Sequence, residues 1–222
     1  MLRRGQSPTE EPDREPRWPA FIAILAAVAL NTGLPEALTM GPRWLFPALV
    51  LALSIPGLIF YHAGRHRLNS IFGFTADGLL TVGLIISVIL LIEALPTNKE
   101  TPQQLLLSAA SLWTTNILVF ALWYWRLDAG GPYQRDKLPG HSDGAFLFPQ
   151  MTMSKEALRD AGQQNWSPNF IDYLFLAFNT STAFSPTDVP ALARWAKILM
   201  MLQSLLSLLI IVLLAARAVN IL

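Results

Sequence analysis

The sequence predicts an all-α integral membrane protein with about five transmembrane helices and a re-entrant, pore-like helix and loop before the last one. The chain of 222 residues is 53% hydrophobic and only 14% charged, far from the composition of soluble domains. Its apolar residues gather in uncharged segments long enough to cross a bilayer. Near the C-terminus, a shorter apolar segment gives way to Ser, Thr and Pro residues, which is typical of a chain that enters the membrane and turns back.

The N-terminal part divides into a tail and a transmembrane region. Residues 1–17 mix arginines and acidic residues among prolines, which predicts a disordered tail. Residues 18–126 are expected to form a four-helix transmembrane region, with apolar segments at residues 18–34, 44–61, 78–95 and 105–125. The first segment is short, so that it either spans the bilayer or lies in the interface. A loop is expected at residues 62–70.

The C-terminal part is expected to contain a polar interfacial linker at residues 127–166, a re-entrant segment at residues 167–190 and an inner helix at residues 191–222. Within the re-entrant segment, Ser167 can cap a helix and Pro168 can open it. The apolar run carries that helix to about Thr180, roughly 13 residues or 20 Å. A bilayer core is about 30 Å thick, so the helix is too short to cross it.

The order of outer helix (residues 105–125), linker, re-entrant helix, non-helical strand and inner helix resembles the pore module of potassium channels. The channel pattern Thr-x-Thr-Thr-Val-Gly-Tyr-Gly-Asp aligns without a gap with Thr180, Ser181, Thr182, Ala183, Phe184, Ser185, Pro186, Thr187 and Asp188. The chain is also similar to a family of uncharacterised small bacterial integral membrane proteins, in its FALWYW, DYLFLAF and AVNIL segments. These resemblances imply a multi-pass protein of the bacterial inner membrane.

The sequence departs from the channel pattern at the filter itself. Ser185 and Thr187 stand where the channels have glycines that permit unusual backbone angles. Pro186 stands at the tyrosine position and removes a backbone N–H. Potassium selectivity is therefore not expected to carry over.

Two sets of polar residues are candidates for lining a path, and each has a second interpretation. In a ring of four copies, Thr180 and Thr182 would add hydroxyl groups and Asp188 a ring of carboxylates. Alternatively, Thr180 and Ser181 cap the helix end and Asp188 caps the next turn. In the inner helix, Gln203, Ser204 and Ser207 form a polar stripe that either faces a water-filled cavity or makes hydrogen bonds between helices.

Two functions remain open. The first is a homotetrameric, cation-permeable channel of unknown selectivity for monovalent cations, and the second is a non-conducting membrane scaffold or accessory subunit. No enzyme is expected, because the chain has no Gly-rich phosphate loop and no HExxH motif. It has no cysteine and a net charge of +1, so that neither a thiolate metal site nor a nucleic-acid partner is expected. No cofactor is expected, and the expected partners are the lipid bilayer and copies of the chain itself.

The distribution of basic residues predicts the orientation in the membrane. With five spans, the positive-inside rule places the N-terminal tail, the loop at 62–70, the linker, Arg194 and Lys197 in the cytoplasm. The re-entrant segment then opens on the cytoplasmic side, which is inverted relative to potassium channels. The usual channel orientation would hold if the first segment lay in the interface without spanning.

Overall fold

The computed structural model describes residues 15–39, 41–94, 101–137, 144–182 and 188–219. In these residues the structure is helical, and the only strand-like pairing in them is an isolated antiparallel bridge between Phe146 and Ala191. The longer helices are α1 (Trp18–Thr32), α2 (Leu45–His62), α3 (His66–Ala94), α4 (Pro102–Leu127), α7 (Phe170–Thr182) and α8 (Arg194–Val219). The short helices are α5 (Pro132–Arg135) and α6 (Lys155–Asp160), and 3-10 turns occupy Glu36–Leu38, Asp128–Gly130 and Pro149–Thr152.

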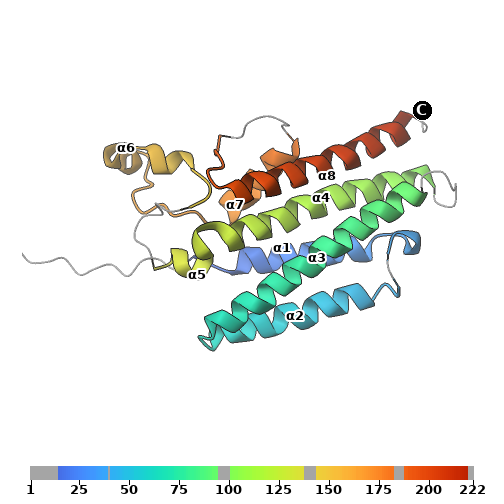
Figure 1. Cartoon of the computed structure of the whole chain (residues 1–222), viewed down its shortest axis with the longest axis horizontal. Coiled ribbons are helices and arrows are strands. Elements are labelled where there is room, and N and C mark those ends of the chain that lie inside the picture. The colour runs from blue at the N-terminus through green and yellow to red at the C-terminus, as the bar shows by residue number, and fades with distance from the viewer. Residues whose placement is uncertain (1–14, 40, 95–100, 138–143, 183–187, 220–222) are drawn as a thin grey trace, which may run out of the picture.

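Five helices, α1, α2, α3, α4 and α8, run alongside one another (Figure 1). Among the described residues, α2, α3, α4 and α8 are long and apolar enough to cross a membrane, whereas α1 is a shorter apolar helix of 15 residues. The described part of the protein is thus all-α, and the length and composition of its four long helices are compatible with a multi-pass membrane protein. We call the end where α1, α3 and α8 begin the loop end, because residues 128–137, 144–169 and 188–193 gather there, and the other end the far end.

Helix α4 is the central element of the bundle. It packs against α1, α3, α7 and α8, and 61% of its apolar window is buried inside the chain, against 17% for α8. Thr101 begins the helix with a capping box, in which its hydroxyl accepts from Gln104 N at 3.2 Å and its backbone N–H donates to Gln104 Oε1 at 2.9 Å. At the far end, α4 shares an apolar cluster with α3 and α8 through residues that include Leu91, Leu105, Leu112 and Ile210.

The third helix differs from the prediction, because it begins at His66 and not near Gly78. The expected loop at residues 62–70 shrinks to a turn of residues 63–65, in which Gly64 adopts a positive φ of 70°. Asp77, which marked the expected boundary, is fully buried and accepts from Arg126 Nε at 2.6 Å. A buried carboxylate is tolerated when a cation pairs with it, so that the helix continues through Asp77.

The end of the expected disordered tail also differs from the prediction. Residues 1–14 lie outside the described part of the chain, but Glu15 and Arg17 are bonded to the loop end. The Glu15 carboxylate accepts from Arg17 Nη1 at 2.9 Å, from Arg135 Nη2 at 3.1 Å and from the Trp125 indole. In the linker, the Ser154 hydroxyl accepts from Ala157 N and caps α6.

The positions of the basic residues on the helices predict how the protein is oriented in a membrane. Basic residues gather at the loop end, among them Arg17, Arg65, Arg67, Arg135 and Lys155. Helix α8 runs from the loop end to the far end, so a membrane that α8 crosses would have the loop end on one side and the last turns of α8 on the other.

A periplasm-dependent phosphatase is therefore expected to be inactive when inserted in α6 and active when fused to the C-terminus. Fluorescent-protein fusions at the same two positions are the control and should give the opposite pattern, because the reporter fluoresces only in the cytoplasm. Phosphatase activity in α6 together with fluorescence at the C-terminus would show that the loop end faces the periplasm.

Candidate functional site

Helix α7 descends along α4 from the loop end toward the middle of the bundle. At its start, the Phe170 ring lies edge-on to Trp125 with 5.9 Å between centroids. Near its end, the Phe178 ring contacts Trp113 with 6.2 Å between centroids. Trp113 and Trp125 are 12 positions apart on α4, which corresponds to about 18 Å along a helix at 1.5 Å per residue.

After α7, the chain comes back to the loop end before α8 begins. The Trp195 ring, in the first turn of α8, lies 5.9 Å from Phe146, whose ring lies 5.2 Å from Tyr124 of α4. Two backbone hydrogen bonds fix this segment, from Leu147 N to Pro190 O at 3.0 Å and from Leu192 N to Ala145 O at 2.7 Å. The start of α8 is therefore level with the end of α4.

The start of α7 is capped differently from the expectation. Asn169 takes the capping position, with its Oδ1 accepting from Ile171 N at 2.9 Å and its backbone N donating to Asp172 Oδ2 at 2.8 Å. Ser167 and Pro168 precede the helix without capping or opening it. The capping position was missed because Ser, Pro and Asn in succession all favour a helix start, and only the Asp172 carboxylate three residues after Asn169 distinguishes it.

A buried hydrogen-bond network ties α7 to α4 and α8, with Gln203 at its centre. The Gln203 side chain is fully buried, and its Oε1 accepts from the Tyr124 hydroxyl at 2.5 Å. Its Nε2 donates to Ala177 O at 2.7 Å and to Ser181 Oγ at 2.8 Å. One amide therefore bonds to two other helices at once, which fixes the depth of α7 against α8.

The rest of the polar stripe on α8 joins the same network. Asn116 Nδ2 of α4 donates to Ser207 Oγ at 2.8 Å and to Gln203 O at 3.3 Å. Ser204 Oγ donates to Thr180 O at 3.2 Å. Of the two interpretations of the stripe, hydrogen bonding between helices matches the positions of these side chains within one chain, where Gln203 and Ser207 have no exposed surface.

The filter-like residues divide between the interior and the surface. Thr180 and Ser181 are buried, and the Thr180 hydroxyl donates to Leu176 O of its own helix at 2.8 Å. Thr182, which ends α7, and Asp188 are exposed. Ala183, Phe184, Ser185, Pro186 and Thr187 lie outside the described residues, and these are the positions at which the resemblance places the filter carbonyls.

A second cluster of polar side chains, at the loop end, did not emerge from the sequence. Arg135 is 4% exposed, and its Nη1 donates to Trp125 O at 2.7 Å and Asp128 O at 2.9 Å. Its guanidinium lies over the Tyr173 ring of α7, 4.9 Å from the centroid. The Tyr173 hydroxyl donates to Asp128 Oδ2 at 2.6 Å. These contacts hold the start of α7 against the end of α4.

Sequence reasoning missed this cluster because Asp128 and Arg135 come from a segment classed as a polar linker. A usable signal was Asp128, a carboxylate directly after the aromatic end of α4 and before Gly130 and Gly131. Both glycines adopt positive φ angles, 76° and 90°, and reverse the chain so that Arg135 folds back under α4.

Comparisons of the chain with family models, with curated proteins and with solved structures give no match. Within the described residues, no group of three or more His, Asp or Glu side chains is placed to hold a metal ion.

Replacing Gln203 with Met keeps the side-chain length but removes all three of its side-chain hydrogen bonds. Because hydrogen bonds between membrane helices contribute about 0.6 kcal/mol each on average and at most about 1.7 kcal/mol, we expect the loss of three to cost roughly 2–5 kcal/mol of stability. The control is Leu205→Met on the exposed face of α8, which should leave stability unchanged. Thermal unfolding in detergent, followed by tryptophan fluorescence, measures the difference, and equal melting temperatures would contradict the anchoring role of Gln203.

Proposed function

We propose that this chain is a subunit of a cation-permeable pore, in which α7 is a re-entrant helix and several copies surround a common axis. The observation that supports it is the path of the chain, which descends from the level of Trp125 to that of Trp113 and is level with Tyr124 again at the start of α8. Irregular backbone at membrane depth persists only where protein buries it or water lines it.

The exposure of α8 supports an assembly of several copies. Helix α8 packs against α4 and α7 through one of its sides (Figure 1). Its outward face is exposed at Ile198, Met201, Leu202, Leu205 and Leu208. Closed symmetric rings are the usual form of homo-oligomers, and four copies follow from the resemblance to the potassium-channel module.

Within such a ring, the residues proposed to face the path are Thr182 and Asp188. Both are exposed in the single chain, and Thr182 ends α7, whose C-terminal carbonyl groups carry partial negative charge. A ring of Asp188 carboxylates would raise the local concentration of cations at the mouth. Thr180 and Ser181 have a different role in this proposal, because their contacts secure α7 to its neighbours.

A non-conducting scaffold or accessory subunit is the second candidate, and one observation favours it. From Ile198 to Val212, the exposed side chains of α8 are all apolar, while its polar side chains Gln203 and Ser207 are fully buried. A path lined by this face would be dry, since hydrophobic constrictions exclude water. The two candidates therefore differ in whether the assembled protein passes ions.

Purified protein in liposomes is expected to pass monovalent cations faster than empty liposomes, measured with a potassium-gradient dye assay. Asp188→Asn should lower both the flux and its preference for cations over anions, by up to about tenfold, because the carboxylate ring sets the local ion concentration. Asp160→Asn, at an exposed position of α6, is the matched control and should change neither. Flux equal to that of empty liposomes in both orientations would leave the scaffold as the function.

Native mass spectrometry from mild detergents or nanodiscs is expected to show four copies of the chain. Replacing exposed apolar residues of α8 with larger ones, as in Leu205→Trp, should weaken the assembly if this face meets other copies, whereas Ile89→Trp on the exposed side of α3 should not. Detection of monomers alone across several detergents would argue against a ring. A tetramer without ion flux would support the scaffold.

A further inference from the structure

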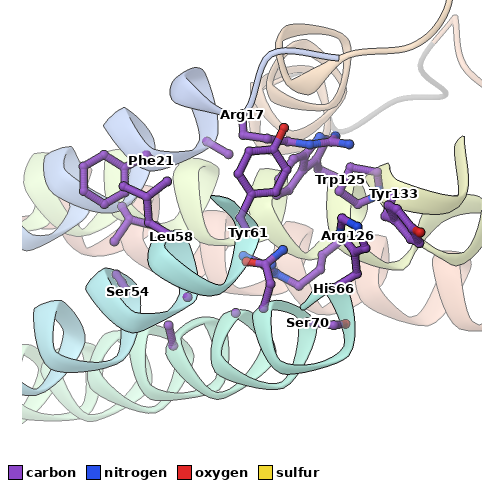
Figure 2. Close-up of a pocket in the computed structure, with 18 of the residues that line it drawn as sticks. Arg17, Phe21, Ser54, Leu58, Tyr61, His66, Ser70, Trp125, Arg126 and Tyr133 are labelled. Carbon is purple, nitrogen blue, oxygen red and sulfur yellow. The ribbon is translucent and has the colours of Figure 1, made fainter. Parts of the chain in front are cut away.

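A cleft on the side of the bundle away from α7 and α8 carries a second inference. It lies at the loop end between α1, α2 and α3, and Figure 2 shows the side chains that line it. One part is polar and aromatic, with Arg17, Tyr61, His66, Arg126 and Tyr133, and the other part is apolar, with residues that include Phe21, Ile24 and Leu58. Its volume is about 110 Å³; a single water molecule needs roughly 10–15 Å³.

Arg126 lines the cleft and has hydrogen-bond donors that are not used within the described structure. Its side chain is 9% exposed, and its Nε donates to Asp77 Oδ2 at 2.6 Å. Among the described residues, neither Nη1 nor Nη2 has a hydrogen-bond partner, although Arg126 lines the cleft. A guanidinium presents its donors as a rigid fork that matches carboxylate and phosphate oxygens. Asp77 takes up the Nε donor of Arg126, so that Nη1 and Nη2 remain able to donate to a ligand.

The surroundings hold the Arg126 guanidinium in this position. Its carbon lies 5.3 Å from the centroid of the Trp125 ring and 5.9 Å from that of Phe74. Gly73 lies directly against it, and a Cβ at that position would come within 2.0 Å of Nη1. The guanidinium therefore occupies space that a side chain at residue 73 would fill. Because these neighbours already hold the guanidinium in place, it loses little entropy when a ligand binds.

The other polar residues of the cleft fit an anion as well. Arg17 lines it while pairing with Glu15 and Asp136, and neither acid is among the lining residues. The Tyr61 hydroxyl lies on the Arg17 side of the cleft (Figure 2). His66 stacks on Tyr133 with 3.6 Å between centroids, and its Nδ1 is buried without a partner in the described structure. The residues that line the cleft thus include two arginines and no carboxylate.

We propose that the cleft binds the phosphate group of an anionic membrane lipid, with Arg126 and Arg17 facing the phosphate. The apolar part supports a lipid over a soluble phosphate, because Ile24 of α1 and Leu53 of α2 continue the cleft from the loop end along the two helices. An acyl chain lies along such a surface, whereas a soluble anion gains nothing from it. The polar part lies at the loop end, where headgroups of a bilayer are found.

The test uses delipidated, full-length protein in detergent and measures binding by native mass spectrometry and by thermal stabilisation. The probes are phosphatidylglycerol, diacylglycerol, which lacks the phosphate, and inorganic phosphate, which lacks the chains. Phosphatidylglycerol is expected to bind at least about tenfold more tightly than either of the others, since charge-assisted hydrogen bonds and chain contacts act together.

Two variants test whether phosphatidylglycerol binds in the cleft. Arg126→Gln should weaken phosphatidylglycerol binding by about tenfold or more. Ser54→Leu fills the apolar part and leaves both arginines in place; because the Ser54 hydroxyl bonds only to Val50 O of its own helix, this variant tests the cleft even if the first fails to fold. Lys197→Gln, an exposed cation at the start of α8, is the control and should have no effect.

Three results would overturn the proposal. The first is phosphatidylglycerol binding that neither cleft variant changes. The second is equal binding of diacylglycerol, which would remove the role of the phosphate. The third is equally tight binding of inorganic phosphate, which would assign the site to a soluble anion. Ion flux is not part of any readout, so that failure of the pore proposal and failure of this one are distinguishable.

Discussion

Polar groups at membrane depth need partners inside the protein, and α4 provides those partners for most of the bundle. Its Arg126 pairs with Asp77 of α3, its Trp123 donates to Thr81 Oγ1 at 2.8 Å, and its Tyr124 and Asn116 bond to α8. Each bond removes a cost that an unpaired group would carry in hydrocarbon, and each also fixes the rotation of one neighbour about its axis. The positions of α3 and α8 therefore depend on polar side chains of a single helix, while apolar contacts fill the space between them.

Helix α7 is held at two depths by different chemistry. At the loop end, Tyr173 is bonded to Asp128 and covered by Arg135, so that charged groups and an aromatic ring fix the start of the helix. Deeper in the bundle, only neutral groups are used, namely the Gln203 amide, the Ser181 hydroxyl and backbone carbonyls. This division follows the cost of burial, which is larger for a charged group than for a neutral polar group. It also means that α7 cannot tilt without breaking bonds at one of its ends.

The lengths of the apolar segments predicted the long helices and the short α7, because these elements depend on local composition. The roles of individual polar residues could not be predicted, because they depend on contacts between residues far apart in the sequence. Asp77 directly precedes the segment at residues 78–95 that was expected to span, and its pairing with Arg126, 49 residues away, places it inside a helix. The stripe of Gln203, Ser204 and Ser207 suited both a wet cavity and a dry contact, since amides and hydroxyls serve either, and the partners on α4 and α7 are not visible along α8 itself. Glu15 and Arg135 acquire their roles only when the tail and linker fold together.

The segment that carries α6 leaves the bundle and comes back at nearly the same point. Phe148 and Trp166 bracket it, with ring centroids 5.7 Å apart, and α6 has no buried residue and projects away from the membrane helices (Figure 1). When the ends of a loop are held together by their own contacts, doubling its length costs only about 0.6 kcal/mol. Natural variation in length, or an engineered insertion such as a whole folded domain, is therefore best accommodated here, where the added chain leaves the registers of α4, α7 and α8 unchanged.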